Sequence, residues 1–175
     1  MASYYYLMAS LPLLRADGEM PFSYDEFLSQ CRGSVSQSRY EMLSGLSADS
    51  SQGPLVSDWA RFYGAIREEL TYQRKTRLGR EAQAPADRDE LVVRSVGAVM
   101  EEKNPLLAEK MLLALEFETL DKLVNQHYFD EAALVGYALK LKLLERKTVF
   151  DKARGKAELD RIVSGLQQQI TEMNV

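Results

Sequence analysis

The sequence predicts an all-α protein that folds as a compact multi-helix bundle, and three observations support this prediction. Apolar residues recur every three or four positions, as at Trp59, Phe62 and Ile66, which places them on one face of a helix. Residues that commonly cap helix N-termini, such as Ser23 and Asn104, precede segments of this kind. No set of segments reads as the strands of a sheet.

The first quarter of the chain contains three expected helices. Three tyrosines in a row at positions 4–6 favour a strand by propensity, but no partner strand is found, so we expect a packed helix there. Ser23 with Glu26 forms a capping-box pattern for a helix that ends at Gly33. A short helix is expected over 38–46, followed by a polar loop that Pro54 closes.

The rest of the chain predicts five longer helices. The first is capped by Ser57 or Asp58 and reaches Gly79, and the second is capped by Asp87 and carries 91–100. The third runs from Asn104-Pro105 to Leu123. The fourth is capped by Asp130 and reaches about Phe150, and the last covers 157–170 after a break at Gly155. The helix over 105–123 is apolar over a wide arc, so we expect it to be the central, most buried element. The expected core contains Trp59, Phe62, Leu106, Phe117, Tyr137 and Leu141.

Length and composition set the domain organisation and exclude some functions. The 175 residues, 46% of them apolar, suit a single domain over 1–175, with 1–53 and 54–175 as an alternative division into sub-lobes. A net charge of −4 argues against nucleic acid as a partner. No apolar stretch is long enough to span a bilayer, and the lone cysteine fits a reducing compartment. We therefore expect a cytoplasmic protein without direct membrane insertion.

No pattern of residues indicates catalysis, a cofactor or a metal. We expect Cys31 to be a half-buried apolar residue in a helix, because a nucleophile would need a basic partner. His127, the only histidine, is expected to pack at the turn before Asp130. The carboxylates of Glu101-Glu102 and Glu116-Glu118 lack histidine or cysteine at helical spacing, so we interpret them as parts of solvated faces. The sequence thus predicts a protein that is not an enzyme.

Two basic tracts are the candidate partner-binding residues. The first contains Arg74, Lys75 and Arg77, and the second contains Lys140, Lys142, Arg146 and Lys147. Cations near a helix C-terminus are favoured by the helix dipole, which accounts for much of this pattern without any function. The functional interpretation is a docking face for an acidic protein partner.

Several stretches together resemble a known family. They are Tyr4–Pro12, Pro21-Phe22 with Phe27-Leu28, Trp59 with Ile66–Leu70, Asn104-Pro105-Leu106, and above all Tyr137–Arg146, which reads YALKLKLLER. This combination is similar to a family of small, uncharacterised bacterial proteins encoded among the genes of V/A-type ATPases. That family is distantly similar in turn to the C-subunit of these ATPases, the helical adaptor known as the d-subunit in eukaryotes.

The resemblance implies an all-helical fold like part of the C-subunit and a non-catalytic role. The protein would be a subunit or an accessory or assembly factor of a V/A-type ATPase, which is a complex of ion and proton transport. It would act as an adaptor between the central rotor stalk and the membrane proteolipid ring, and be held peripherally at the inner membrane through the complex. The chain departs from the family pattern at Leu107, where an acidic residue is expected.

Two other functions remain open from the sequence. One is a free-standing helical adaptor or regulatory protein with no connection to the ATPase. The other is a small enzyme centred on His127, which would require a pocket around that side chain. Association into a homo-oligomer through the apolar stripe of the last helix is also left open.

Overall fold

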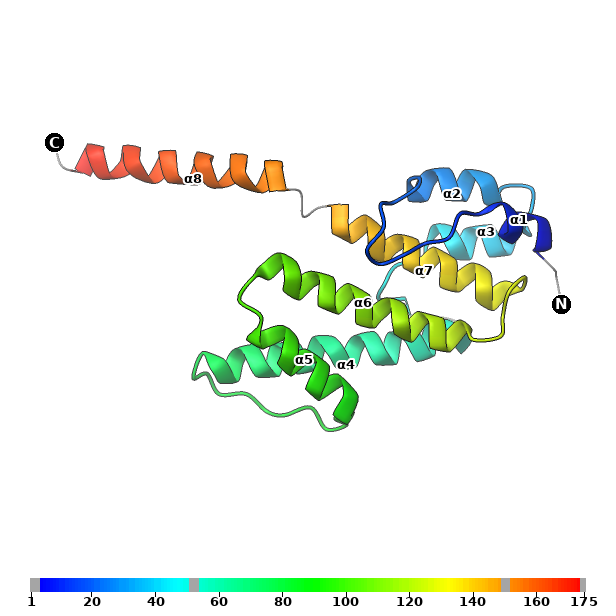
Figure 1. Ribbon diagram of the computed structural model, residues 1–175, viewed down its shortest axis with the longest axis horizontal. Coiled ribbons are helices and arrows are strands. Elements are labelled where there is room, and N and C mark those ends of the chain that lie inside the picture. Colours follow the sequence, from blue (N-terminus) through cyan, green and yellow to red (C-terminus); the bar gives the residue numbers. More distant parts are fainter. Residues whose placement is uncertain (1–3, 51–53, 149–151, 174–175) are drawn as a thin grey trace. The chain divides into compact units, whose positions relative to one another are not determined.

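The computed structural model describes residues 4–50, 54–148 and 152–173, and these residues form helices and no strand. The prediction of an all-α fold is therefore confirmed. The helices are α1 (Tyr5–Ser10), α2 (Tyr24–Cys31), α3 (Gln37–Ser44), α4 (Pro54–Arg77), α5 (Glu90–Glu101), α6 (Pro105–Val124), α7 (Glu131–Thr148) and α8 (Lys152–Met173) (Figure 1). None of the described helices has both the length and the apolar character needed to cross a membrane.

The chain divides into two compact units, Met1–Glu145 and Arg146–Val175. The first unit contains the buried hydrophobic residues, which form two clusters. In the second unit, the described side chains of residues 155–165 in α8 are exposed.

The larger cluster draws on α1, α2, α3, the first half of α4, the second half of α6 and α7. Trp59 is fully buried in it, and its indole Nε1 donates a hydrogen bond to the carbonyl oxygen of Ala48 at 2.9 Å. The rings of Phe62 and Tyr63 lie against the indole, with centroid distances of 5.8 and 5.4 Å. A buried tryptophan of this kind contributes about 3–5 kcal/mol to stability relative to alanine. The first half of α4 therefore holds the loop after α3 in place.

The smaller cluster joins α4, α5 and α6, which pack against one another (Figure 1). Ile66 and Leu70 from the second half of α4 meet Val96 of α5 and Leu112 of α6. α5 is short, but its apolar residues all fall on the inward face, since Val92, Val96 and Val99 follow the three-to-four spacing. This packing fixes the C-terminal half of α4 in the body of the first unit.

α6 and α7 form an antiparallel pair joined by a tight turn. α6 ends at Val124, and Asn125 has a positive φ of 41°, a conformation that asparagine tolerates better than most residues. The helices approach closely where Gly136 faces Val124, because a Cβ atom on Gly136 would lie 2.3 Å from Val124 Cγ2. Lys140 of α7 also pairs with Asp121 of α6.

The expectation that α6 is the most buried helix is wrong. More of α7 is buried, since nearly every residue from Ala133 to Leu144 is inaccessible, whereas α6 buries only one stripe. The expected core residues Trp59, Phe117 and Leu141 are buried, and Phe62 and Tyr137 pack against the core. Leu106 is 46% exposed because it lies in the first turn of α6, which the described residues of the first unit leave uncovered. A wide apolar arc therefore does not guarantee burial at the end of a helix.

Most of the predicted helix starts are confirmed. Ser23 and Glu26 form a reciprocal capping box at α2, and Asn104 caps α6 with Pro105 as the first helical residue. Asp130 accepts a hydrogen bond from the backbone N–H of Ala133 in the first turn of α7. The tyrosine-rich N-terminal segment forms a helix over Tyr5–Ser10, as predicted, and not a strand.

Three predicted boundaries are wrong. α4 begins at Pro54, so Ser57 and Asp58 lie inside the helix and do not cap it. Proline is well suited to the first helical position because the N–H it lacks would be unpaired there. The cap of α5 is Asp89, not Asp87. Gly155 lies inside α8 and does not break it, because a glycine within a helix costs only about 1 kcal/mol. The expected end of the preceding helix near Phe150 lies outside the described residues.

Candidate functional site

The candidate site is the basic cluster at the end of α4, formed by Arg74, Lys75 and Arg77. All three side chains are exposed. After Arg77 the chain turns through Gly79, which has a φ of +65°, and the backbone N–H of Arg80 donates to the carbonyl oxygen of Lys75 at 2.9 Å. The turn thereby brings a fourth exposed cation, Arg80, close to the cluster.

The basic cluster carries positive charge that the described part of the chain does not neutralise. Several other arginines of the first unit are paired, for example Arg67 with Asp49 and Arg94 with Glu90. None of the three cluster residues forms an ion pair with a carboxylate of the described residues. The negative end of the α4 dipole stabilises these cations locally, but it leaves their outward charge available to a partner.

Arg77 has a structural contact as well as a charge. Its Nη1 donates a hydrogen bond of 2.6 Å to the carbonyl oxygen of Met100, in the last turn of α5. This bond satisfies a carbonyl that has no partner within the helix. Arg77 therefore ties the end of α5 to the end of α4, whereas Arg74 and Lys75 have no such role in the described contacts.

The second basic tract is used inside the fold. Lys140 pairs with Asp121 and lies over the ring of Phe117, and only 16% of its side chain is exposed. Lys142 donates to Glu145 at 3.1 Å, and its Nζ lies 3.7 Å from the ring centroid of Tyr24. These contacts hold α7 against α6 and α2, so the two lysines present less free charge than the cluster on α4.

Arg146 and Lys147 complete the predicted set. Both are half-buried in the last turn of α7, and each has an interaction partner. The structure thus brings together Arg74, Lys75 and Arg77, and no described contact joins them to the tract on α7. Whether any of these residues binds a partner stays a prediction.

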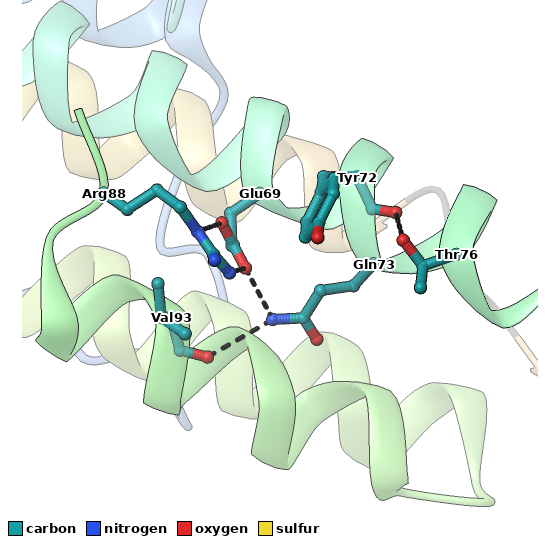
Figure 2. Close-up of polar contacts among 6 residues, drawn as sticks. All are labelled: Glu69, Tyr72, Gln73, Thr76, Arg88 and Val93. Atoms are coloured by element: carbon teal, nitrogen blue, oxygen red, sulfur yellow. Dashed lines mark hydrogen bonds and ion pairs between the residues drawn. The ribbon is translucent and has the colours of Figure 1, made fainter. Parts of the chain in front are cut away.

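An ion pair with a buried carboxylate joins α4 to the segment that leads into α5. Glu69, on α4 one turn before Arg74, is only 2% exposed. Arg88, in the segment that leads into α5, binds it with two hydrogen bonds, 2.9 Å to Oε2 and 2.6 Å to Oε1 (Figure 2). Paired bonds of this kind are stronger and more directional than a single contact. They fix the segment after α4 against the helix that carries the cluster.

Two neighbours complete this network. The side-chain amide of Gln73 donates to Glu69 at 2.8 Å and to the carbonyl oxygen of Val93 at 3.4 Å, and the Arg88 guanidinium lies 5.0 Å from the ring centroid of Tyr72 (Figure 2). The hydrogen bonds from Arg88 hold the pKa of Glu69 below its ordinary value, and they outweigh burial, which acts in the opposite direction. Glu69 is therefore a carboxylate at neutral pH, with its charge matched inside the fold.

This network was not predicted from the sequence, although one signal was present. Ile66, Glu69, Leu70 and Gln73 share the inward face of α4 by spacing, and an acidic residue among apolar ones on such a face requires a partner. Its partner, Arg88, comes from an irregular segment, where no periodicity could identify it.

The side chains of Cys31 and His127, which were considered as catalytic candidates, make contacts typical of structural residues. Cys31 is fully buried, and burial raises the pKa of its thiol to about 11. His127 pairs with Asp130 and is half exposed at the turn between α6 and α7. Burial acts to raise the pKa of Asp130, but hydrogen bonds from His127 and the backbone of Ala133 hold it below its usual value. The described residues contain no group of three or more histidine, cysteine or acidic side chains arranged to hold a metal ion.

The prediction that Glu116 lies on a solvated face is wrong. Glu116 is 2% exposed because it shares the inward face of α6 with Leu112, Leu113 and Leu120, and it has an interaction partner. Glu118 is exposed as expected and pairs with Lys122 at 2.8 Å.

Fold and site together define an all-helical protein with an exposed, unneutralised cationic surface at one helix end. A family model described as a protein of unknown function (DUF2764) matches residues 89–170, from the cap of α5 into α8. The chain is thus similar to this uncharacterised family over the segment that contains α6 and α7. Comparison with curated proteins and with solved structures gave no match.

Proposed function

We propose that this chain is a non-catalytic helical adaptor of a V/A-type ATPase. In this proposal it is a subunit or an assembly factor that links the central rotor stalk to the membrane proteolipid ring. The observation that carries the proposal is the set of exposed cations without ion pairs at Arg74, Lys75 and Arg77. The sequence resemblance in Tyr137–Arg146 and the other stretches supplies the identity of the complex.

The basic cluster suits binding to an acidic protein surface. Unpaired surface cations raise the rate at which an oppositely charged partner associates and orient it on approach. The backbone that carries the cluster is also held in place, because Arg77 is bonded to α5 and the pair of Glu69 and Arg88 fixes the segment that follows α4. An adaptor that transmits force or fixes the spacing of partners benefits from such rigidity, since little ordering is needed on binding.

Co-purification from native membranes tests this proposal. The chain, tagged and expressed in its own organism, should bring down stalk and ring subunits of the ATPase at low salt, identified by mass spectrometry. The double substitution Arg74→Glu and Lys75→Glu should lower the yield of these subunits by about tenfold or more, since it replaces attraction with repulsion. Arg77 is left unchanged because of its bond to Met100.

A matched control separates docking from general charge effects. Lys75→Glu alone is compared with Lys110→Glu, which makes the same change at another exposed helical lysine without a described ion pair. Only Lys75→Glu should weaken co-purification. If no ATPase subunits are recovered with the unmodified chain, the proposal fails and a free-standing adaptor becomes the better explanation. Equal losses in the two variants would contradict the assignment to the basic cluster.

A further inference from the structure

Four aromatic side chains lie exposed where α1 begins and where α6 turns into α7. The exposed fractions are 53% for Tyr5, 88% for Tyr6, 67% for Tyr128 and 42% for Phe129. We call these four residues the aromatic patch. Large rings at this level of exposure are unusual for a surface that meets only water, since each leaves much apolar area in contact with solvent.

The aromatic patch is one connected surface. Ring centroids are 4.6 Å apart for Tyr5 and Phe129, 5.6 Å for Tyr5 and Tyr6, and 6.4 Å for Tyr128 and Phe129. The backbone N–H of Tyr4, a buried residue, donates to the carbonyl oxygen of Phe129 at 2.8 Å. Two segments far apart in the sequence are therefore fastened together, and the ring of Tyr5 lies against that of Phe129 between them.

The acidic side chains that border the aromatic patch in the sequence have partners within the chain. His127 pairs with Asp130, and Glu131 pairs with Arg39. The patch therefore differs from the basic cluster, because recognition here depends on apolar contact rather than on charge.

We propose that the aromatic patch is a self-association surface, and that its occupant is the same patch of a second copy of this chain. With roughly 200 Å² for each aromatic side chain, the patch exposes on the order of 500 Å². Two copies joined about a two-fold axis would then bury roughly 1,000 Å², which is the lower limit for a specific protein interface. A weak, reversible dimer is expected from this area.

The chemistry of the rings favours pairing with themselves. Aromatic rings prefer tilted or edge-to-face contacts, and the patch offers both edges and faces, since Tyr5 and Tyr6 are nearly perpendicular, at 89°, and Tyr5 and Phe129 are tilted by 48°. Because Asp130 and Glu131 each have a partner, two copies brought together would not set unpartnered carboxylates of the described bordering residues against each other. Dimerisation through the patch does not depend on the proposed role at the ATPase, which uses the basic cluster.

Sedimentation equilibrium of the purified chain over a wide concentration range, up to about 1 mM, tests the proposal. A monomer–dimer equilibrium is expected, with little change between low and high salt. The double variant Tyr6→Ser and Tyr128→Ser should weaken dimerisation by about tenfold or more. Both side chains are mostly exposed, so the variant should fold, which its circular dichroism and thermal unfolding verify.

A control and three contrary outcomes complete the experiment. Leu13→Ser removes another large apolar side chain, 85% exposed and outside the patch, and should leave the dimer unchanged. A chain that stays monomeric at every concentration overturns the proposal, as does a dimer that is equally stable in the patch variant. A third outcome is a chain that stays monomeric but floats with neutral phosphatidylcholine vesicles, while the patch variant does not float. That outcome would identify the patch as a lipid-binding surface and would also overturn the proposal.

Discussion

At the scale of single residues, the most consequential interaction is the buried pair of Glu69 and Arg88. A carboxylate that is 2% exposed is tolerated because a guanidinium and the amide of Gln73 replace its water. Removing one partner of such a pair leaves an unmatched buried charge, whereas replacing both by apolar residues can be nearly neutral. The network therefore contributes more to the specific arrangement of α4 and the segment before α5 than to the free energy of unfolding.

Arg88→Leu is expected to lower the thermal unfolding midpoint at pH 7. The pKa of Glu69 is lowered in the folded state, so the stability from this pair is present above the ordinary glutamate pKa of about 4.3 and is lost as pH falls through the lower folded value. The difference between wild type and variant should therefore be large at pH 7 and shrink below about pH 4. Thermal unfolding followed by circular dichroism across this range measures it.

Two further variants test that assignment. Arg94→Leu makes the same change at an exposed pair, whose side chains are 76% and 87% exposed, and should have little effect at any pH. The double variant Glu69→Leu and Arg88→Leu should recover much of the loss. A pH-independent difference for Arg88→Leu would show that lost packing, rather than the ion pair, is responsible.

Cys31 provides a second prediction at this scale. The side chain is fully buried and the pKa of its thiol is raised to about 11, so the reactive thiolate is scarce and inaccessible. The native protein should react with a thiol reagent such as DTNB only at the rate of unfolding, and fully once it is denatured. Fast labelling of the native protein at neutral pH would contradict the burial of α2 against the core.

At the scale of elements, α6 and α7 approach each other closely at Gly136. Gly136 faces Val124, and a β-branched side chain in a helix has one strongly preferred rotamer and cannot easily move aside. The pair thus sets the distance between two helices that bury much of the larger core.

Gly136→Ala should destabilise the protein by about 1–3 kcal/mol through overpacking, although alanine is the better helix former. Gly97→Ala in α5 is the control, because a Cβ atom there would meet nothing within 4 Å, and it should be neutral or stabilise by up to about 1 kcal/mol. Adding Val124→Ala to Gly136→Ala should relieve the clash. Urea unfolding of the four proteins measures these differences, and equal effects of the two glycine substitutions would contradict the close approach.

Sequence predicted the elements well where the signal is local. Ser23 with Glu26, and Asn104 with Pro105, mark helix starts because the capping partners lie within one turn. The failures are of a different kind: Leu106 reads as core by composition, yet only its position at the end of α6 explains why it is 46% exposed. Arg88 and the aromatic patch depend on contacts between distant segments, which periodicity does not encode.

At the scale of the whole molecule, the buried residues of the described chain all lie between Tyr4 and Leu144. Both hydrophobic clusters are complete within the first compact unit. The candidate site and the aromatic patch belong to the same unit, so each has its supporting contacts there.

A chain that ends after Thr148 should therefore fold and unfold cooperatively, with a thermal midpoint close to that of the full chain. A chain that ends after Asp130 should not fold, because it lacks α7 and with it a large share of the larger cluster. Circular dichroism and differential scanning calorimetry of both truncations distinguish the two cases. A failure of the longer fragment to fold would mean that residues 149–175 supply necessary core contacts.

Trp59 also gives the protein an internal optical reporter. It is the only tryptophan in the sequence, and it is buried between Tyr63 and the loop that contains Ala48. Its fluorescence emission should be blue-shifted in the native state and move to longer wavelength when that loop separates from α4. Stopped-flow refolding could thus follow the joining of the first three helices to the rest of the body, without an added dye.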